Sequence, residues 1–315
     1  MPEPQYPVIL ICSPYLALAG ETSIWQAALP SGVEHVELLV DSTLTCPDLR
    51  KSPSLACDVK SGPSAEKMKN EAAASGVRIE LFVAPLHLKA DMKSAPEWAK
   101  TLLETASSAG ARQVSFPLVT DNFMVPEIPD QDYLDSALSI FSSLVEAAGK
   151  NGIRVLFENL SVYLNRTEIL GRILNEFTRE ELGFCLDPVN LCWYGHPRAE
   201  VYRITGEVAP RCTGLHIKNI KYPPDKIECR REPGWRYDEL VVPAEKGDLD
   251  FARVIRNFST SGFDGYYGIE DDSLNLAAEP ERLAILRSSV EYVREILDGI
   301  RPSPKARTLE LRTTK

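Results

Sequence analysis

The sequence predicts an α/β fold with a single domain, a (β/α)8 barrel, and three observations support this prediction. Eight short apolar runs recur along the 315 residues, with amphipathic stretches between them whose apolar residues follow three- and four-residue steps. The turn after the first run, CSPYLALAG, lacks the Gly-x-Gly-x-x-Gly pattern that the main alternative, a doubly wound open sheet, normally carries there. No segment of the chain stands out as a second domain.

The eight apolar runs are predicted to be the barrel strands. They are VILIC (8–12), VEHVELLV (33–40), GVRIELFVA (76–84), ARQVSFP (111–117), GIRVLFE (152–158), LGFCLD (182–187), CTGLHIK (212–218) and GYYGIE (265–270). The clearest helices between them are 97–110, 133–152 and 251–262, and a last helix is predicted over 280–299. We assign 1–300 to the barrel and expect the basic, proline-containing stretch 301–315 to be a disordered tail.

Composition and charge argue against several classes of protein. Hydrophobic residues make up 44% and charged residues 25%, as in soluble globular proteins, and no apolar run is long enough to span a membrane. The N-terminus lacks the basic start of a signal peptide. Seven cysteines without a Cys-x-x-Cys pair indicate a reducing, cytoplasmic location. A net charge of −10 repels nucleic acid, so the expected partner is a small molecule, and a homo-oligomer remains open.

The last four predicted strands each end on a residue that can bind a metal ion or move a proton. In a (β/α)8 barrel the C-terminal strand ends form the active site, and alternate side chains along a strand face inward. This alternation directs Glu158, Asp187, His216 and Glu270 into the barrel. Any one of them would be ordinary as a solvated or lysine-paired strand end. Four in succession with matching parity indicate a functional site.

The chain resembles the xylose isomerase-like TIM barrels, specifically the sugar phosphate isomerases and epimerases that include ketose 3-epimerases. The resemblance extends over nearly the whole chain and rests on the order of GVEHVEL, GIRVLFENL, LGFCLDPVN, GLHIKN, KGDLDF and GYYGIE. That family binds one divalent ion through Glu, Asp, His and Glu of strands five to eight. The resemblance therefore implies Glu158, Asp187, His216 and Glu270 as ligands, with Glu158 and Glu270 removing and returning a proton on opposite faces of the substrate.

The donor set agrees with this chemistry. Three carboxylates and one imidazole suit Mn²⁺, Co²⁺ or Mg²⁺ better than a structural zinc ion. Such an ion can chelate a carbonyl and the adjacent hydroxyl, acidify the neighbouring C–H bond and stabilise the enediolate that forms.

Three motifs depart from the family's pattern. A frequent Asp-x-x-His ends here in Asn190, and a frequent His-x-Lys-Asp ends in Asn219. The usual Gly-Glu-Gly-Asp-x-Asp reads EKGDLD at 245–250. An Asn side chain hydrogen-bonds a substrate oxygen but does not titrate near neutrality as His does. These departures leave the identity of the substrate unassigned.

Further candidates for substrate binding lie around the predicted site: Asn190, Lys218, His87, Arg230 and Arg236. Lys218 shares the parity of His216 and would meet an oxyanion or neutralise the carboxylates. His87 would contact substrate or be a surface histidine. The two arginines belong to a loop at 220–243 that would close over an anionic or polyhydroxylated substrate, or be a solvated charge run. Glu37 faces inward on the second strand and would orient a ligand or form a buried ion pair.

We therefore predict a divalent-metal-dependent sugar isomerase or epimerase that abstracts a proton next to a carbonyl. A lyase, either a dehydratase or a 3-keto-glycoside eliminase, shares this first step. A barrel that binds sugar without turnover is a third reading. The related apurinic endonucleases need a histidine-rich trinuclear zinc site, and a chain with four histidines does not fit it.

Overall fold

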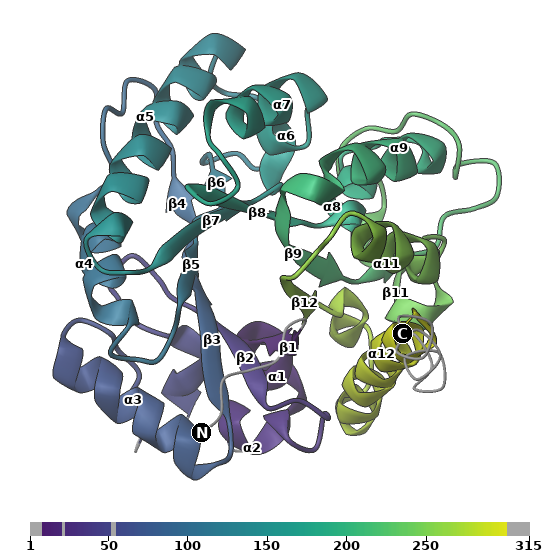
Figure 1. Ribbon diagram of the computed structural model, residues 1–315. Helices are drawn as coiled ribbons and strands as arrows, with labels where there is room; N and C mark the ends of the chain where they lie inside the picture. The colour runs from purple at the N-terminus through teal and green to yellow at the C-terminus, as the bar shows by residue number, and fades with distance from the viewer. Residues whose placement is uncertain (1–7, 21–22, 52–54, 301–315) are drawn as a thin grey trace, which may run out of the picture.

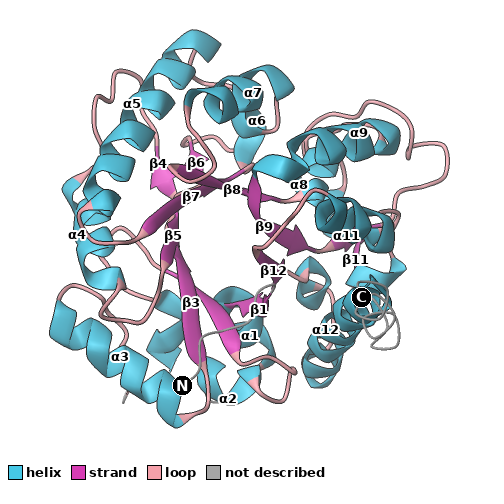
Figure 2. Cartoon of the chain, in the orientation of Figure 1, coloured by secondary structure: helices cyan, strands magenta, loops and turns pink. Residues whose placement is uncertain are grey.

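The computed structural model describes residues 8–20, 23–51 and 55–300, so the predicted tail 301–315 lies outside the described residues. Eight parallel strands close into a barrel surrounded by helices (Figures 1 and 2), which confirms the predicted fold. Around the barrel the strands are β1 (Val8–Cys12), β12 (Tyr266–Ile269), β9 (Cys212–Ile217), β8 (Leu182–Leu186), β7 (Arg154–Glu158), β5 (Gln113–Ser115), β3 (Arg78–Val83) and β2 (His35–Leu39). Each strand lies within its predicted run.

Twelve α-helices in the described ranges connect and cover the strands: α1 (Ser13–Ala19), α2 (Ile24–Ala28), α3 (Gly62–Ala74), α4 (Glu97–Ala106), α5 (Asp130–Gly149), α6 (Ser161–Leu164), α7 (Thr167–Glu176), α8 (Pro188–Trp193), α9 (Arg198–Val208), α10 (Tyr237–Leu240), α11 (Phe251–Thr260) and α12 (Glu279–Ile300). Short 3₁₀ turns occupy Pro47–Lys51, Ala209–Arg211, Ala244–Lys246 and Asp272–Asn275. Two small sheets lie outside the barrel, β4 (Leu86–His87) with β6 (Leu118–Val119), and β10 (Asn219–Ile220) with β11 (Val241–Val242).

Side chains alternate along the strands as predicted. Leu10, Leu156 and Cys185 belong to a small buried cluster inside the barrel. The next residues along, such as Phe157 and Phe184, point the other way and stack with ring centroids 4.8 Å apart in the larger core beneath the helices. Burying each such ring contributes roughly 1.5–3 kcal/mol, so the outer core fixes the parity that directs Glu158 inward.

Glycines in the barrel strands make room for its largest inward side chains. The register aligns His216 with Gly268, where an added Cβ would lie 2.8 Å from the imidazole Cδ2. The same register aligns Gly214 with Tyr266, where an added Cβ would lie 2.5 Å from the phenol ring. Gly268 therefore leaves the room that the His216 ring occupies beside the neighbouring strand.

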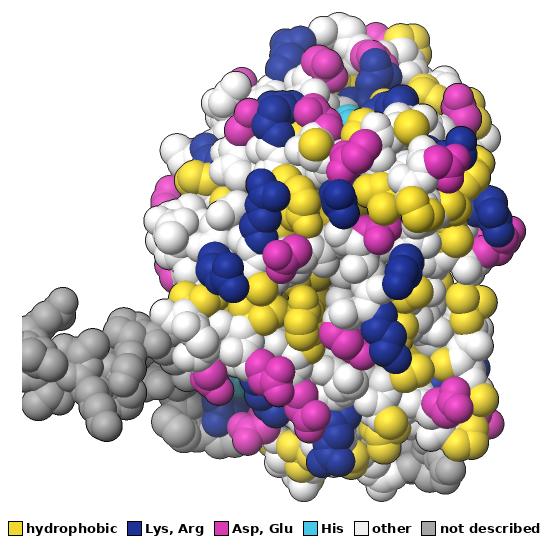
Figure 3. Space-filling view, turned by 90° about the vertical axis from the view of Figure 1, so that its right-hand side faces the viewer, with side chains coloured by type: hydrophobic (Ala, Val, Ile, Leu, Met, Phe, Trp, Pro, Cys, Tyr) yellow, Lys and Arg dark blue, Asp and Glu magenta, His cyan; other side chains and the backbone are white. Residues whose placement is uncertain are grey.

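The surface in Figure 3 mixes acidic and basic side chains without a basic stripe across that face. No helix in the described part of the chain is long and apolar enough to cross a membrane.

Candidate metal and catalytic site

The four predicted metal ligands meet at the C-terminal end of the barrel. Glu158 is the last residue of β7, Asp187 follows β8, His216 lies on β9 and Glu270 follows β12. One donor atom from each lies within 4.8 Å of the others. Glu158, Asp187 and His216 are buried, and Glu270 is partly exposed at the mouth. The side chains thus surround a space of the size that one ion needs.

Asp187 is held in place by the start of α8. Pro188 occupies the first helical position, and Asp187 Oδ1 accepts hydrogen bonds from the N–H groups of Val189 (2.8 Å) and Asn190 (3.1 Å), as a helix N-cap does. The side chain of Asn159 also donates to the Asp187 carbonyl (2.8 Å) and accepts from its N–H (2.7 Å). These bonds leave Oδ2 turned toward the centre of the site.

Asn190 contacts the predicted base directly. Its Nδ2 donates a hydrogen bond to Glu158 Oε1 over 2.8 Å. Because the amide donates this bond, it fixes the orientation of the Glu158 carboxylate. Asn190 therefore lies within the site and holds the carboxylate, and its substrate contact stays a prediction.

His216 is 2% exposed and lies among carboxylates. Its Nδ1 is 3.3 Å from Glu270 Oε1 and 3.6 Å from Glu158 Oε1, and neither ring nitrogen has a hydrogen-bond partner in the described residues. Burial alone would lower the pKa of His216, but Cys185, Glu270 and Glu158 together raise it well above its usual value. A buried, unpartnered imidazole nitrogen facing carboxylates fits a metal ligand.

Lys218 supplies positive charge beside these carboxylates. Its Nζ lies 2.7 Å from Asp187 Oδ2, 3.0 Å from Glu270 Oε2 and 3.6 Å from Asp272 Oδ2. Burial opposes the charged form, yet these acids and Tyr237 hold the pKa of Lys218 well above its usual value. Lys218 therefore remains an ammonium group that neutralises part of the cluster and can face a developing oxyanion.

Two tyrosines from separate short helices meet at Asp272, and sequence reasoning missed all three residues. The hydroxyl of Tyr15, on α1, donates to Asp272 Oδ1 (2.7 Å), and that of Tyr237, on α10, donates to Oδ2 (2.5 Å). The run Glu270-Asp271-Asp272 directly after β12 was the available signal for the acid. The sequence offered no such signal for the two tyrosines, because only the packing of the folded chain brings them to Asp272.

Comparison with known proteins agrees with this fold. The sequence model of the xylose isomerase-like TIM barrel matches residues 25–296. The chain belongs to this family. No curated protein sequence matches the chain.

Solved structures share the fold of this xylose isomerase-like barrel at low identity. An IolI protein with a bound zinc atom has a TM-score of 0.67 and 15% identity, covering 94% of this chain and 100% of that chain. An L-ribulose 3-epimerase has a TM-score of 0.63 and 13% identity, covering 98% and 99%. The probable 3-DHS dehydratase AsbF from Bacillus anthracis has a TM-score of 0.60 and 15% identity, covering 91% and 98%. At these identities the likeness establishes the fold.

The arginines of the predicted lid have partners of their own. Arg230 Nη1 lies 2.9 Å from His196 Nδ1, and Arg236 pairs with Glu239 over 2.7 Å. Arg231 is buried and donates to backbone carbonyls, including that of His196 (2.8 Å), so it anchors the loop. Substrate binding by Arg230 and Arg236 stays a prediction.

His87 is exposed, whereas Glu37 is buried. The side chain of His87 on β4 is 63% exposed, with Nδ1 3.3 Å from Asp121 Oδ1, and its predicted substrate contact also stays a prediction. Glu37 on β2 is 1% exposed, as its inward parity predicts. Its Oε2 lies 3.6 Å from His216 Nε2, whereas Glu158 and Glu270 lie nearest to Nδ1 of the same ring.

The two departures after β9 have a structural explanation. Asn219 donates to the carbonyls of Ala244 (2.7 Å) and Leu249 (3.0 Å). Gly247 packs against it, since an added Cβ there would lie 2.0 Å from Asn219 Cγ. Asp250 caps α11 through the N–H of Arg253. These hydrogen bonds therefore hold the segment 244–250 in place beside the C-terminal end of the barrel.

Proposed function

We propose that this protein is a divalent-metal-dependent isomerase or epimerase that acts on a sugar or sugar derivative by abstracting a proton next to a carbonyl. The observation that carries the proposal is the cluster of three carboxylates and one imidazole with donor atoms within 4.8 Å at the C-terminal end of the barrel. Charged groups are seldom buried together unless a cation or a reaction requires them. The family match and the epimerase among the fold neighbours support this reading.

A divalent ion held by Glu158, Asp187, His216 and Glu270 would supply Lewis-acid stabilisation of the enediolate. Glu158, oriented by Asn190, would take the proton from the carbon next to the carbonyl. Glu270 enters from β12 and would return a proton from another side of the ring of strands. Lys218, paired with Glu270, would place an ammonium group near the developing negative charge.

A lyase is the second candidate. The same deprotonation leads to elimination when an acid protonates a leaving oxygen. The Tyr15 and Tyr237 hydroxyls, both bonded to Asp272 beside Lys218, are suitable proton donors. A probable dehydratase is among the fold neighbours. The two reactions differ in product, which makes them separable.

The test is hydrogen exchange with solvent. A library of keto sugars, aldoses and 3-keto-glycosides is incubated in D₂O with the Mn²⁺-loaded protein, and the ion is removed with a chelator before NMR spectra are taken. We expect deuterium at one C–H next to a carbonyl, with an isomer or epimer as product, and none with Glu158→Gln. Loss of water or of a fragment would identify the lyase. Binding without exchange would contradict both and leave a sugar-binding barrel.

The location we propose is the cytoplasm. The seven cysteines, all described by the structure, are free thiols, which suits a reducing compartment.

A further inference from the structure

A second group of metal-competent side chains shares His216 and Glu270 with the cluster described above and adds two residues from β1 and β2. Cys12 ends β1, Glu37 lies on β2, and they join His216 and Glu270 with one donor atom each within 4.8 Å of the others. The strands β2, β1, β12 and β9 are consecutive in the barrel, and the register places Cys12 next to Glu37. Cys12 and Glu37 are each 1% exposed.

Glu37 is a buried carboxylate without a basic hydrogen-bond partner among the described residues. Neither of its oxygens accepts a hydrogen bond from a nitrogen or oxygen donor there, and its hydrogen-bonding neighbour is the Cys12 thiol. The nearest basic atom, His216 Nε2, is 3.6 Å away, beyond hydrogen-bonding distance. The Lys218 ammonium group forms its ion pairs with Asp187 and Glu270. Because a buried carboxylate without a basic partner is unfavourable, this position favours a cation.

The alternative role of Glu37 is to orient His216 by accepting its Nε2–H, as carboxylates often do for a metal-bound imidazole. That role explains Glu37 but not Cys12, whose thiol lies in the same group. A sulfur donor beside a carboxylate and an imidazole nitrogen forms a softer set than Glu158, Asp187, His216 and Glu270. The two groups of donor atoms therefore differ in the ion that they favour.

We propose that Cys12 Sγ, the Glu37 carboxylate, His216 Nε2 and Glu270 form a second cation position, selective for Zn²⁺ or Co²⁺ over Mg²⁺. A tetrahedral ion with bonds of about 2.0–2.3 Å needs donor atoms about 3.3–3.8 Å apart, a modest contraction that side-chain rotation supplies. The thiol releases its proton to solvent on binding. Because both positions use His216 and Glu270, zinc at the thiol position competes with Mn²⁺ or Mg²⁺ at the oxygen-rich one, a consequence that rests on the proposed function.

Cobalt spectroscopy tests the position without reference to activity. The metal-free full-length protein is titrated with Co²⁺, and we expect the near-ultraviolet thiolate-to-cobalt charge-transfer band. Cys12→Ser should abolish the band. A matched control should keep it: Cys229→Ser, which replaces an exposed thiol outside the barrel. No band in the wild-type protein at saturating Co²⁺, or a band that survives Cys12→Ser, overturns the proposal.

Two more variants separate this site from the proposed catalytic one. Glu37→Gln keeps the side-chain size, so it tests the position even if Cys12→Ser misfolds. It should weaken Zn²⁺ binding more than about 100-fold if Glu37 is a ligand, because residues that only orient a ligand change metal affinity 10–100-fold. Asp187→Ala lies outside the thiol group and should lose Mn²⁺ binding while keeping the cobalt band. A band lost equally in Asp187→Ala and Cys12→Ser would contradict a separate position. Failure of Mn²⁺ binding alone would count against the proposed function only.

Discussion

A buried histidine lies at each end of the barrel, and the two have opposite surroundings. His35, at the start of β2, is 8% exposed and has one carboxylate partner, Glu80, 3.1 Å away. His216, on β9, is 2% exposed and lies within 3.6 Å of three carboxylates, Glu37, Glu158 and Glu270, without a hydrogen bond to any. His35 thus has a single carboxylate partner, whereas His216 is surrounded by more carboxylates than one imidazole can pair with.

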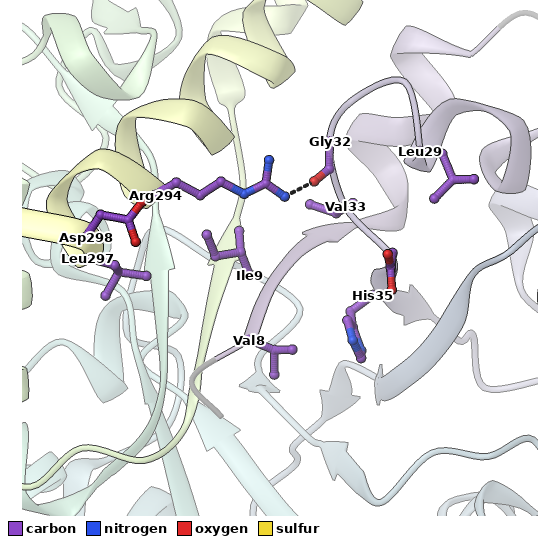
Figure 4. Close-up of a pocket in the computed structure, with 10 residues that line it drawn as sticks. Val8, Ile9, Leu29, Gly32, Val33, His35, Arg294, Leu297 and Asp298 are labelled. Carbon is purple, nitrogen blue, oxygen red and sulfur yellow. Dashed lines mark hydrogen bonds between the residues drawn. The ribbon is translucent and has the colours of Figure 1, made fainter. Parts of the chain in front are cut away.

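This contrast locates the chemistry better than cavity size does. A hollow of about 530 Å³ opens at the N-terminal end of the barrel (Figure 4), where Arg294 donates a hydrogen bond to the Gly32 carbonyl and Val8, Val33 and His35 line the wall. None of the acids of the candidate site lines it. In (β/α)8 barrels the N-terminal end serves stability, and catalytic groups lie at the C-terminal end. Unbalanced buried charge is therefore the more informative sign of function.

The largest expected effect sets the two histidines against each other. His216→Ala removes a metal ligand, so the affinity for Mn²⁺ should fall more than about 100-fold, since even residues that only orient a ligand change affinity 10–100-fold. His35→Ala should leave the affinity within about twofold. It should instead lower the free energy of unfolding by about 1–3 kcal/mol, because Glu80 loses a partner. Calorimetric titration and denaturant unfolding measure both, and equal effects on Mn²⁺ would remove the distinction between the two ends.

The second expected effect is pH dependence of metal uptake. The pKa of His216 is raised above its usual value because the surrounding negative groups outweigh burial. The raised pKa favours a protonated ring in the metal-free protein, and an ion that binds there must displace that proton. The apparent affinity for Mn²⁺ should therefore rise with pH, by about tenfold per unit until the raised pKa is passed. Titrations between pH 6 and pH 9 would show this, and a flat profile would indicate that His216 is already neutral or is not a ligand.

The sequence was sufficient for the part of the site that depends on strand periodicity. Glu158, Asp187, His216 and Glu270 face inward because neighbours such as Phe157 must be buried beneath the helices. The grouping of Cys12 with Glu37 depends instead on register between strands β1 and β2, which a single chain pattern does not contain.

Loop residues were the least predictable part. The arginines of 220–243 read as a charged lid, but Arg231 is buried against the ring of Tyr222, with its guanidinium 3.9 Å from the ring centroid. Tyr237 of the same loop, a residue without charge or periodicity, is the one that reaches Asp272. A loop side chain takes its place from long-range packing, so its type alone does not fix its role.

A third, smaller effect is expected for that tyrosine. Tyr237→Phe removes the 2.5 Å hydrogen bond to Asp272, and a bond to a charged group contributes about 1.5–3 kcal/mol. We expect part of this lost free energy to appear as poorer positioning of the substrate. KM should therefore rise about 3–10-fold, while the affinity for the metal ion stays unchanged. Tyr222→Phe is the matched control. Tyr222 belongs to the same loop as Tyr237, but its hydroxyl donates to the Cys192 carbonyl and not to Asp272. A KM that rises equally in both variants would indicate general loosening of the loop.

The smallest effect concerns Arg236. Its guanidinium side chain is 50% exposed and pairs with Glu239 three residues on, and an exposed pair of this kind contributes only about 0–1 kcal/mol. Arg236→Ala should therefore leave folding and metal content intact. If the loop closes over an anionic substrate, KM should rise about twofold, and the rise should shrink at high salt because exposed charges are screened. Glu239→Ala, which frees the same arginine, should then lower KM. Unchanged KM in both variants would show that this pair is a solvated surface contact, and that the loop acts on the site through Tyr237 alone.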